Sequence, residues 1–186
     1  TESNGSTAVI EAAKGVPFKD LKDQNKDSYT VVLNNAPLAN ETVRVTLSVP
    51  ANQLAQLAFS DASGNDLPRD PLTNLPYLVF TASTWNTAQT VVLSSPGDDI
   101  AENRFVAEIT HVVSSIDGST GQEGFFKSSL VAKQIVRVQV TDGNTAGVLV
   151  TPAAGGVAVT PTQNSYYDLV LTTAPTGPVT IALAND

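Results

Sequence analysis

The chain has 186 residues, a net charge of −8, a single histidine, and neither cysteine nor methionine. A protein without cysteine has no disulfide, no cysteine-ligated zinc and no thiol nucleophile. Its 10 Lys and Arg against 18 Asp and Glu argue against a nucleic-acid partner, because a groove for phosphates needs concentrated positive charge. The sequence also contains no apolar run long enough for a membrane span and no signal-peptide pattern at its start.

Five segments alternate apolar and polar residues with a period of two, which predicts strands with one buried face. In chain order they are 43–49, 78–80, 91–93, 105–110 and 136–140. Turn-forming residues separate them, as in Ser-Pro-Gly-Asp at 95–98. Because no helical pattern of the kind that connects parallel strands is present, we predict an all-β fold, an antiparallel immunoglobulin-like β-sandwich.

Two connections are longer than ordinary hairpin loops, 52–76 and 114–129. Apolar residues at helical spacing predict a short helix over 51–59, within the first connection and outside the core. The second connection carries Phe125 and Phe126. These rings are expected either to contact a neighbouring molecule or to pack over one end of the sandwich.

A repeat with an offset of 138 residues runs through the chain. The segment 29–37, Tyr-Thr-Val-Val-Leu-Asn-Asn-Ala-Pro, returns as Tyr-Asp-Leu-Val-Leu-Thr-Thr-Ala-Pro at 167–175. At the same offset Gly-Ser-Thr-Ala at 5–8 matches Gly-Asn-Thr-Ala at 143–146, and with a two-residue gap 43–47 matches 179–183. Three matches in the same order indicate a tandem repeat.

The repeat predicts three parts: residues 1–6 as the tail of a preceding unit, 7–142 as a complete sandwich, and 143–186 as the first strands of a following unit. Two or three isolated strands cannot bury an apolar face. The second unit is therefore expected either to continue in a longer parent chain or to be completed by strands of a neighbouring chain.

Two stretches carry a resemblance to a known family. Phe-Thr-Ala-Ser-Thr-Trp-Asn-Thr-Ala-Gln-Thr-Val-Val-Leu at 80–93, followed by Gly-Asp-Asp at 97–99, resembles the surroundings of the fifth strand of Calx-beta-like repeats. The segment 138–152 is similar to the junction between successive units of those repeats, and 167–183 resembles their second and third strands. The family forms tandem sandwiches in large bacterial surface proteins.

The resemblance implies an extracellular or cell-surface module with calcium sites between units. In the family, acidic residues come from the loop before the sixth strand, the end of the last strand and an early strand. Asp98, Asp99 and Glu102 match the first group and Asp142 the second. The early acidic residue has no clear match, with Asp20 or Asp23 nearest.

Calcium takes six to eight oxygen ligands, so four side chains would need backbone carbonyls and water to complete the shell. The alternative is that 97–99 is a polar turn and Asp142 caps the junction. His111 and Trp85 are expected to be structural, since His111 has no second histidine or cysteine to act with. Asn4 and Asn40 begin glycosylation sequons.

We therefore expect a non-catalytic structural or adhesive module, as in an adhesin stalk, a surface layer or a biofilm matrix. The alternatives are a module whose junction is stiffened by Ca²⁺, and a filament or lattice subunit completed by a neighbouring chain. The expected partners are adjoining repeats, other copies of the protein, and surface ligands or glycans.

Overall fold

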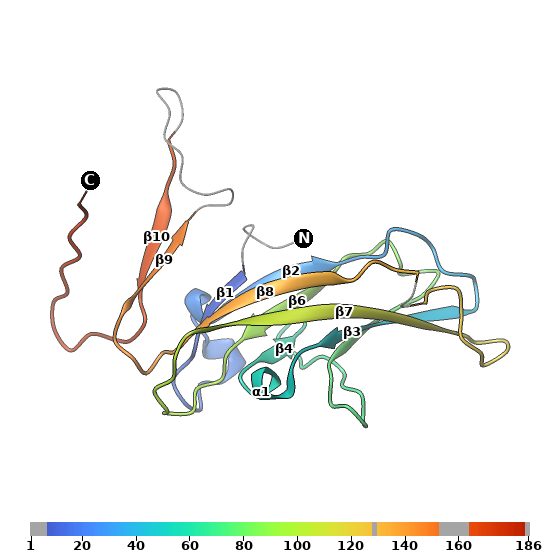
Figure 1. The fold of residues 1–186 in the computed structure, drawn as a ribbon, viewed down its shortest axis with the longest axis horizontal. Coiled ribbons are helices and arrows are strands. Elements are labelled where there is room, and N and C mark those ends of the chain that lie inside the picture. Colours follow the sequence, from blue (N-terminus) through green and yellow to red (C-terminus); the bar gives the residue numbers. More distant parts are fainter. Residues whose placement is uncertain (1–6, 128–129, 153–163, 185–186) are drawn as a thin grey trace.

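The computed structural model describes residues 7–127, 130–152 and 164–184. Their strands form an all-β, sandwich-like fold with two main sheets and a separate hairpin (Figure 1). The larger sheet has the order β1 (Thr7–Ile10), β8 (Gln134–Thr141), β7 (Phe105–Asp117), β3 (Glu41–Ser48), β5 (Tyr77–Phe80). The smaller sheet has the order β2 (Lys26–Val31), β6 (Gln89–Ser94), β4 (Ala58–Ser60).

Three short helical turns lie in the connections of the sandwich. They are η1 (Phe18–Asp20), η2 (Asp23–Asn25) and α1 (Ala51–Leu54). The pairing is antiparallel, as predicted, except between β1 and β8, which run parallel from Thr7 opposite Val138 to Ile10 opposite Thr141. The first and eighth strands therefore lie side by side at one edge of the larger sheet.

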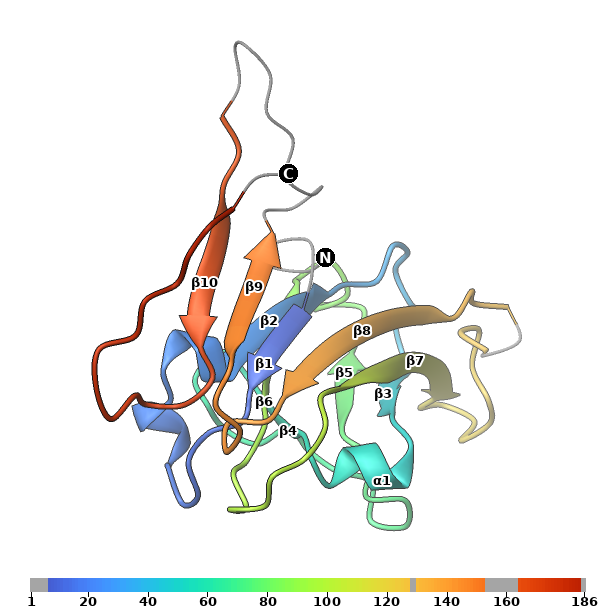
Figure 2. The ribbon, with the colours of Figure 1, turned by 60° about the vertical axis from the view of Figure 1, so that its left-hand side comes forward.

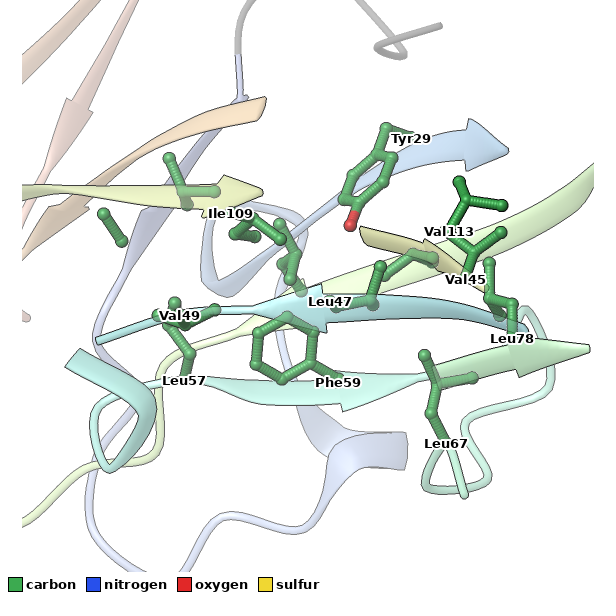
Figure 3. Packing of buried hydrophobic residues seen from close by; sticks show 14 of the residues in the cluster. Tyr29, Val45, Leu47, Val49, Leu57, Phe59, Leu67, Leu78, Ile109 and Val113 are labelled. Carbon is green, nitrogen blue, oxygen red and sulfur yellow. The ribbon is translucent and has the colours of Figure 1, made fainter. Parts of the chain in front are cut away.

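The core lies between the two sheets and is built by the predicted alternation. Along β3, the buried residues Val43, Val45 and Leu47 alternate with more exposed ones. Leu78 and Phe80 of β5 and the inward residues of β6, β7 and β8 complete the same layer. Figure 3 shows Leu47 and Ile109 facing the residues contributed by the smaller sheet.

The predicted helix over 51–59 is wrong in its second half. The helix α1 ends at Leu54, and Ala58–Ser60 form β4, in which Phe59 pairs with Leu93 of β6. Leu57 and Phe59 belong to the buried core, close to Val49 and Leu47 (Figure 3). Short apolar runs fit a helix or a strand equally well, and here the pairing with β6 decides for a strand.

A buried carboxylate orders the second long connection. The Phe126 N–H donates to Glu41 Oε1 at 3.1 Å, and the Leu38 N–H donates to Glu41 Oε2 at 3.0 Å. Burial alone would raise the pKa of Glu41, but these bonds and one from the Ser115 hydroxyl outweigh it and lower the pKa. Phe126 is thereby held in the core, whereas Phe125 is exposed.

His111 and Trp85 both pack within the sandwich. His111 is buried, with Nε2 3.1 Å from the Tyr29 hydroxyl and Nδ1 3.1 Å from the Gln134 carbonyl oxygen. Burial lowers the pKa of His111. Trp85 is half-buried against the core, and its carbonyl oxygen accepts a bond from the Leu33 N–H.

Beyond the sandwich, β9 (Val148–Pro152) and β10 (Tyr167–Leu171) form an antiparallel hairpin. In Figure 1 the hairpin projects beyond one end of the sandwich, and in Figure 2 its upper part extends past β1 and β2. The start of β10 at Tyr167 agrees with the predicted strand. The expected third strand over 179–183 is not formed. The matching strand of the first unit, β3, pairs with β5 and β7, whereas no described strand pairs with 179–183.

The division at 142 and 143 remains a prediction from the repeat, and residues 1–6 lie outside the described part.

We predict that Phe59→Ala lowers the free energy of unfolding by about 3–5 kcal/mol, because it leaves a large cavity in the core. Phe125→Ala is the matched control: the Phe59 side chain is 1% exposed and that of Phe125 is 68% exposed. The control is expected to change stability by no more than about 0.5 kcal/mol. Urea unfolding measures both, and equal losses would contradict this description of the core.

Candidate functional site

The segment that follows β1 crosses from one sheet to the other at the end of the sandwich. The Glu11 N–H donates to the Thr141 carbonyl oxygen at the end of β8, at 2.8 Å. The next residue, Ala12, donates its N–H to the Ser95 carbonyl oxygen just after β6, at 3.0 Å. Two consecutive residues therefore connect the C-terminal ends of β8 and β6, which belong to different sheets.

Glycines on both sides make room for this crossing. A Cβ atom at Gly97 would lie 1.9 Å from the Ala12 carbonyl oxygen, and one at Gly143 would lie 2.3 Å from the Glu11 carbonyl oxygen. Both contacts are with backbone atoms, which cannot move aside as a flexible side chain can. The crossing segment therefore requires glycine at these two positions.

The Glu11 carboxyl group lies inside this crossing and is 4% exposed. Its Oε1 accepts a bond from the Asp98 N–H at 3.0 Å, and its Oε2 accepts a longer one from the Gly143 N–H at 3.4 Å. Glu11 thus connects the loop after β6 with the chain that leaves β8.

Asp142 is the second buried acidic residue at this end and is 6% exposed. Its Oδ1 accepts from the Asn144 N–H at 2.6 Å. Its Oδ2 accepts from the Glu102 N–H at 2.8 Å and from the Thr145 hydroxyl at 2.6 Å. Asp142 therefore fastens the loop before β7 to the first residues of the chain leading to β9. We call Glu11 and Asp142 the junction pair.

The junction pair has opposed pKa shifts. Burial raises the pKa of Glu11, and the hydrogen bond to Asp142 and the charge of Asp98 act in the same direction, against the two N–H bonds. Burial would also raise the pKa of Asp142. Instead the pKa is lowered by the hydrogen bonds that Asp142 accepts from Thr145 and from the backbone, and by its hydrogen bond with Glu11. Glu11 is accordingly the member of the pair that keeps its proton to higher pH.

These shifts have opposite effects on stability. Because the folded protein raises the pKa of Glu11, the charged Glu11 carboxylate costs stability at pH values above its folded pKa. Because the pKa of Asp142 is lowered, its contribution is present above the ordinary value of 3.8 and is lost as the pH falls through its folded pKa.

The four predicted ligand residues are not gathered around one point. Asp99 is exposed and forms an ion pair with Lys14 at 3.1 Å, and the Glu102 carboxylate accepts a bond from the Gln56 amide at 3.2 Å. The Asp98 carboxylate accepts from the Ile100 N–H at 2.8 Å. Among residues 7–127, 130–152 and 164–184, no three His, Cys, Asp or Glu side chains are grouped as they are around a metal ion.

Glu11 is the functional candidate that sequence reasoning missed. Asp20 and Asp23 were the nearest matches to the early acidic ligand of the family. In the structure Asp20 pairs with Lys19 at 3.1 Å, and Asp23 lies exposed in η2. The available signal was a single charged residue within the apolar run Ala-Val-Ile-Glu-Ala-Ala at 8–13. A charge at such a position is rarely buried without hydrogen-bond partners.

The first of the two glycosylation sequons, at Asn4, lies outside the described residues. Asn40 is exposed, and its side-chain amide donates to the Ser119 hydroxyl at 2.8 Å. Of the helices that the structure describes, none is long and apolar enough to cross a membrane.

Comparisons with known proteins give little further information. No protein-family model and no curated protein matches the chain. Among the solved structures that match is that of the periplasmic chaperone SfaE, similar at 12% sequence identity and a TM-score of 0.31, over 98% of this chain and 87% of that chain. A likeness at this TM-score does not establish a shared fold.

We predict that Asp142→Ala destabilises the protein by about 1–3 kcal/mol, because it removes the buried carboxylate that accepts hydrogen bonds from Glu102, Asn144 and Thr145. The control is Asp99→Asn, which removes an exposed ion pair and keeps a residue type suited to the positive φ at this position, and it is expected to cost at most about 1 kcal/mol. Thermal or urea unfolding compares them, and an Asp142→Ala variant as stable as Asp99→Asn would show that the junction is not held in this way.

Proposed function

We propose that this chain is a non-catalytic structural module of a tandem-repeat protein at the cell surface or outside the cell. The observation that carries the proposal is the anchored exit of the chain. Asp142 binds both Asn144 and Thr145, and Thr145 in turn accepts a bond at its carbonyl oxygen from the Thr172 hydroxyl at 2.6 Å, at the end of β10. A continuous series of hydrogen bonds therefore runs from the sandwich to the hairpin. Such a connection is what a module needs if it is to hold the next unit at a fixed distance and orientation.

We assign the sandwich to the immunoglobulin-like class, and within it to the Calx-beta-like type. The strand order supports this: β8, β7, β3 and β5 face β2 and β6, with β1 at the edge beside β8 and β4 added beside β6. The repeated segments 29–37 and 167–175 support a tandem arrangement.

We further propose that the junction binds Ca²⁺. Burial, the hydrogen bond to Asp142 and the charge of Asp98 raise the pKa of Glu11, so a divalent cation beside the junction pair would offset the cost of ionising Glu11. Glu11 and Asp142 would hold the ion. Because calcium takes six to eight oxygens, backbone carbonyl groups and water would supply the remainder. The ion would supply fixed positive charge between the two sheets and the exit of the chain.

Thermal unfolding with calcium and with chelator tests the metal. A ligand that binds only the folded protein stabilises it by about 2.7 kcal/mol at 100 times its dissociation constant. We expect calcium to raise the melting temperature of the natural protein and to leave Glu11→Gln unchanged. Asp61→Asn is the control, since the Asp61 carboxylate closes a distant turn by accepting the N–H groups of Ser63 and Asn65. No effect of calcium on the natural protein would reject the metal site.

The structural role is tested separately by ¹⁵N relaxation. If the junction holds the hairpin in place, amides of β10 and of β7 share one rotational correlation time. In Asp142→Ala the β10 amides are expected to tumble faster than those of β7. Independent motion of the hairpin in the natural protein, with calcium present, would contradict the proposed role.

A further inference from the structure

An apolar groove of about 600 Å³ opens between the edges of the two sheets, where β2 approaches the first half of β8. Apolar side chains from both sides line it, with Val31 and Leu33 on one side and Val136 and Phe126 on the other. Its size lies within the range of protein ligand pockets. The groove leads to the hydrogen-bonded Tyr29 and His111.

The strand beside this groove has a free edge. Within the described residues, β1 pairs with β8 only from Val138 to Thr141, so 134–137 have a neighbour on the β7 side alone. On the opposite side of the groove, β2 is the outer strand of its sheet and pairs with β6. An edge of this kind can accept an added strand through its backbone groups.

The same chain carries a segment suited to that edge. In 179–183 the apolar residues Val179, Ile181 and Leu183 alternate with Thr and Ala, and they are 53%, 40% and 70% exposed. The matching residues of the first unit, at 43–47, are buried in β3. The segment 176–184 contains no charged residue, so its entry into an apolar groove leaves no charge unpaired.

We propose that 179–183 of one copy adds as a strand to 134–137 of a second copy and places its three apolar side chains in the groove. Segment and groove are different surfaces, so the contact is head-to-tail. Each joined pair keeps one free groove and one free segment. Association therefore continues beyond the pair, into a ring where the rotation closes and into an open chain where it does not. This inference goes beyond the proposed structural module and needs no calcium.

Sedimentation velocity over a concentration series tests the inference. We expect the natural chain to form dimers and larger species as concentration rises. Ile181→Asp, which changes the segment, and Val136→Asp, which changes the groove, are each expected to remain monomeric. If Val136→Asp does not fold, Ile135→Glu takes its place, because Ile135 also lines the groove and is 48% exposed.

Mixing the two variants is the decisive step. Ile181→Asp keeps an intact groove and Val136→Asp keeps an intact segment, so an equimolar mixture is expected to form a species of two chains and nothing larger. Val150→Asp, at an exposed position on β9 outside the segment, is the matched control and is expected to associate like the natural chain.

Several results would overturn the proposal. These are a natural chain that stays monomeric at all concentrations, groove variants that associate normally, and a mixture that stays monomeric. Association that is lost in Val150→Asp and kept in Ile181→Asp would indicate pairing between two hairpins instead. A chain beginning at Thr7 that associates where the full chain does not would show that residues 1–6 cover the groove.

Discussion

The buried Glu11 carboxyl group is the interaction on which the junction end of this protein depends. The backbone of Glu11 binds the end of β8 and its neighbour Ala12 binds the chain after β6, while the Glu11 side chain binds the Asp98 and Gly143 N–H groups. One short segment thus closes the sandwich between its sheets and fixes the two loops that lead toward Asp142. Burying a carboxyl group is costly unless donors surround it, and here the donors come from the loops that must be held.

At the opposite end of the sandwich a second buried carboxyl group also binds backbone N–H groups, but its pKa is shifted in the other direction. Glu41 is also buried and accepts bonds from two backbone N–H groups and from the Ser115 hydroxyl, and its pKa is lowered. Glu11 receives fewer and longer bonds and faces a second carboxyl group, and its pKa is raised. The first arrangement favours the charged form of the carboxyl group, whereas the second disfavours it.

Much of the fold follows from the sequence because it is encoded locally. The alternation at 43–49 and 105–110 predicts which side chains of β3 and β7 are buried, since neighbours along a strand point to opposite faces. The strand β4 was missed because three residues carry too little periodicity, and only the pairing of Phe59 with Leu93 defines them. The parallel pairing of β1 with β8 joins residues more than 120 positions apart, and no local pattern contains it.

The candidate site was only partly predictable for the same reason. Asp142 was predicted because it matches the acidic residue at the end of the last strand in the Calx-beta-like repeats that the sequence resembles. Glu11, the partner of Asp142, could not be predicted, because it bonds to Asp98 and Gly143, which lie 87 and 132 residues away along the chain. Asp99 and Glu102 have the expected residue type and spacing. However, the Asp99 carboxylate pairs with Lys14 and the Glu102 carboxylate accepts a hydrogen bond from the Gln56 amide.

The central claim is that Glu11 and Asp142 meet as a buried pair of which Glu11 holds its proton more tightly. Carboxyl ¹³C NMR of the intact chain, titrated with pH, measures this directly. We expect Glu11 to titrate above its ordinary pKa of 4.5 and Asp142 below its ordinary pKa of 3.8, and we expect calcium to lower the apparent pKa of Glu11. A Glu11 carboxyl group that titrates at or below its ordinary pKa in the absence of calcium would contradict the claim.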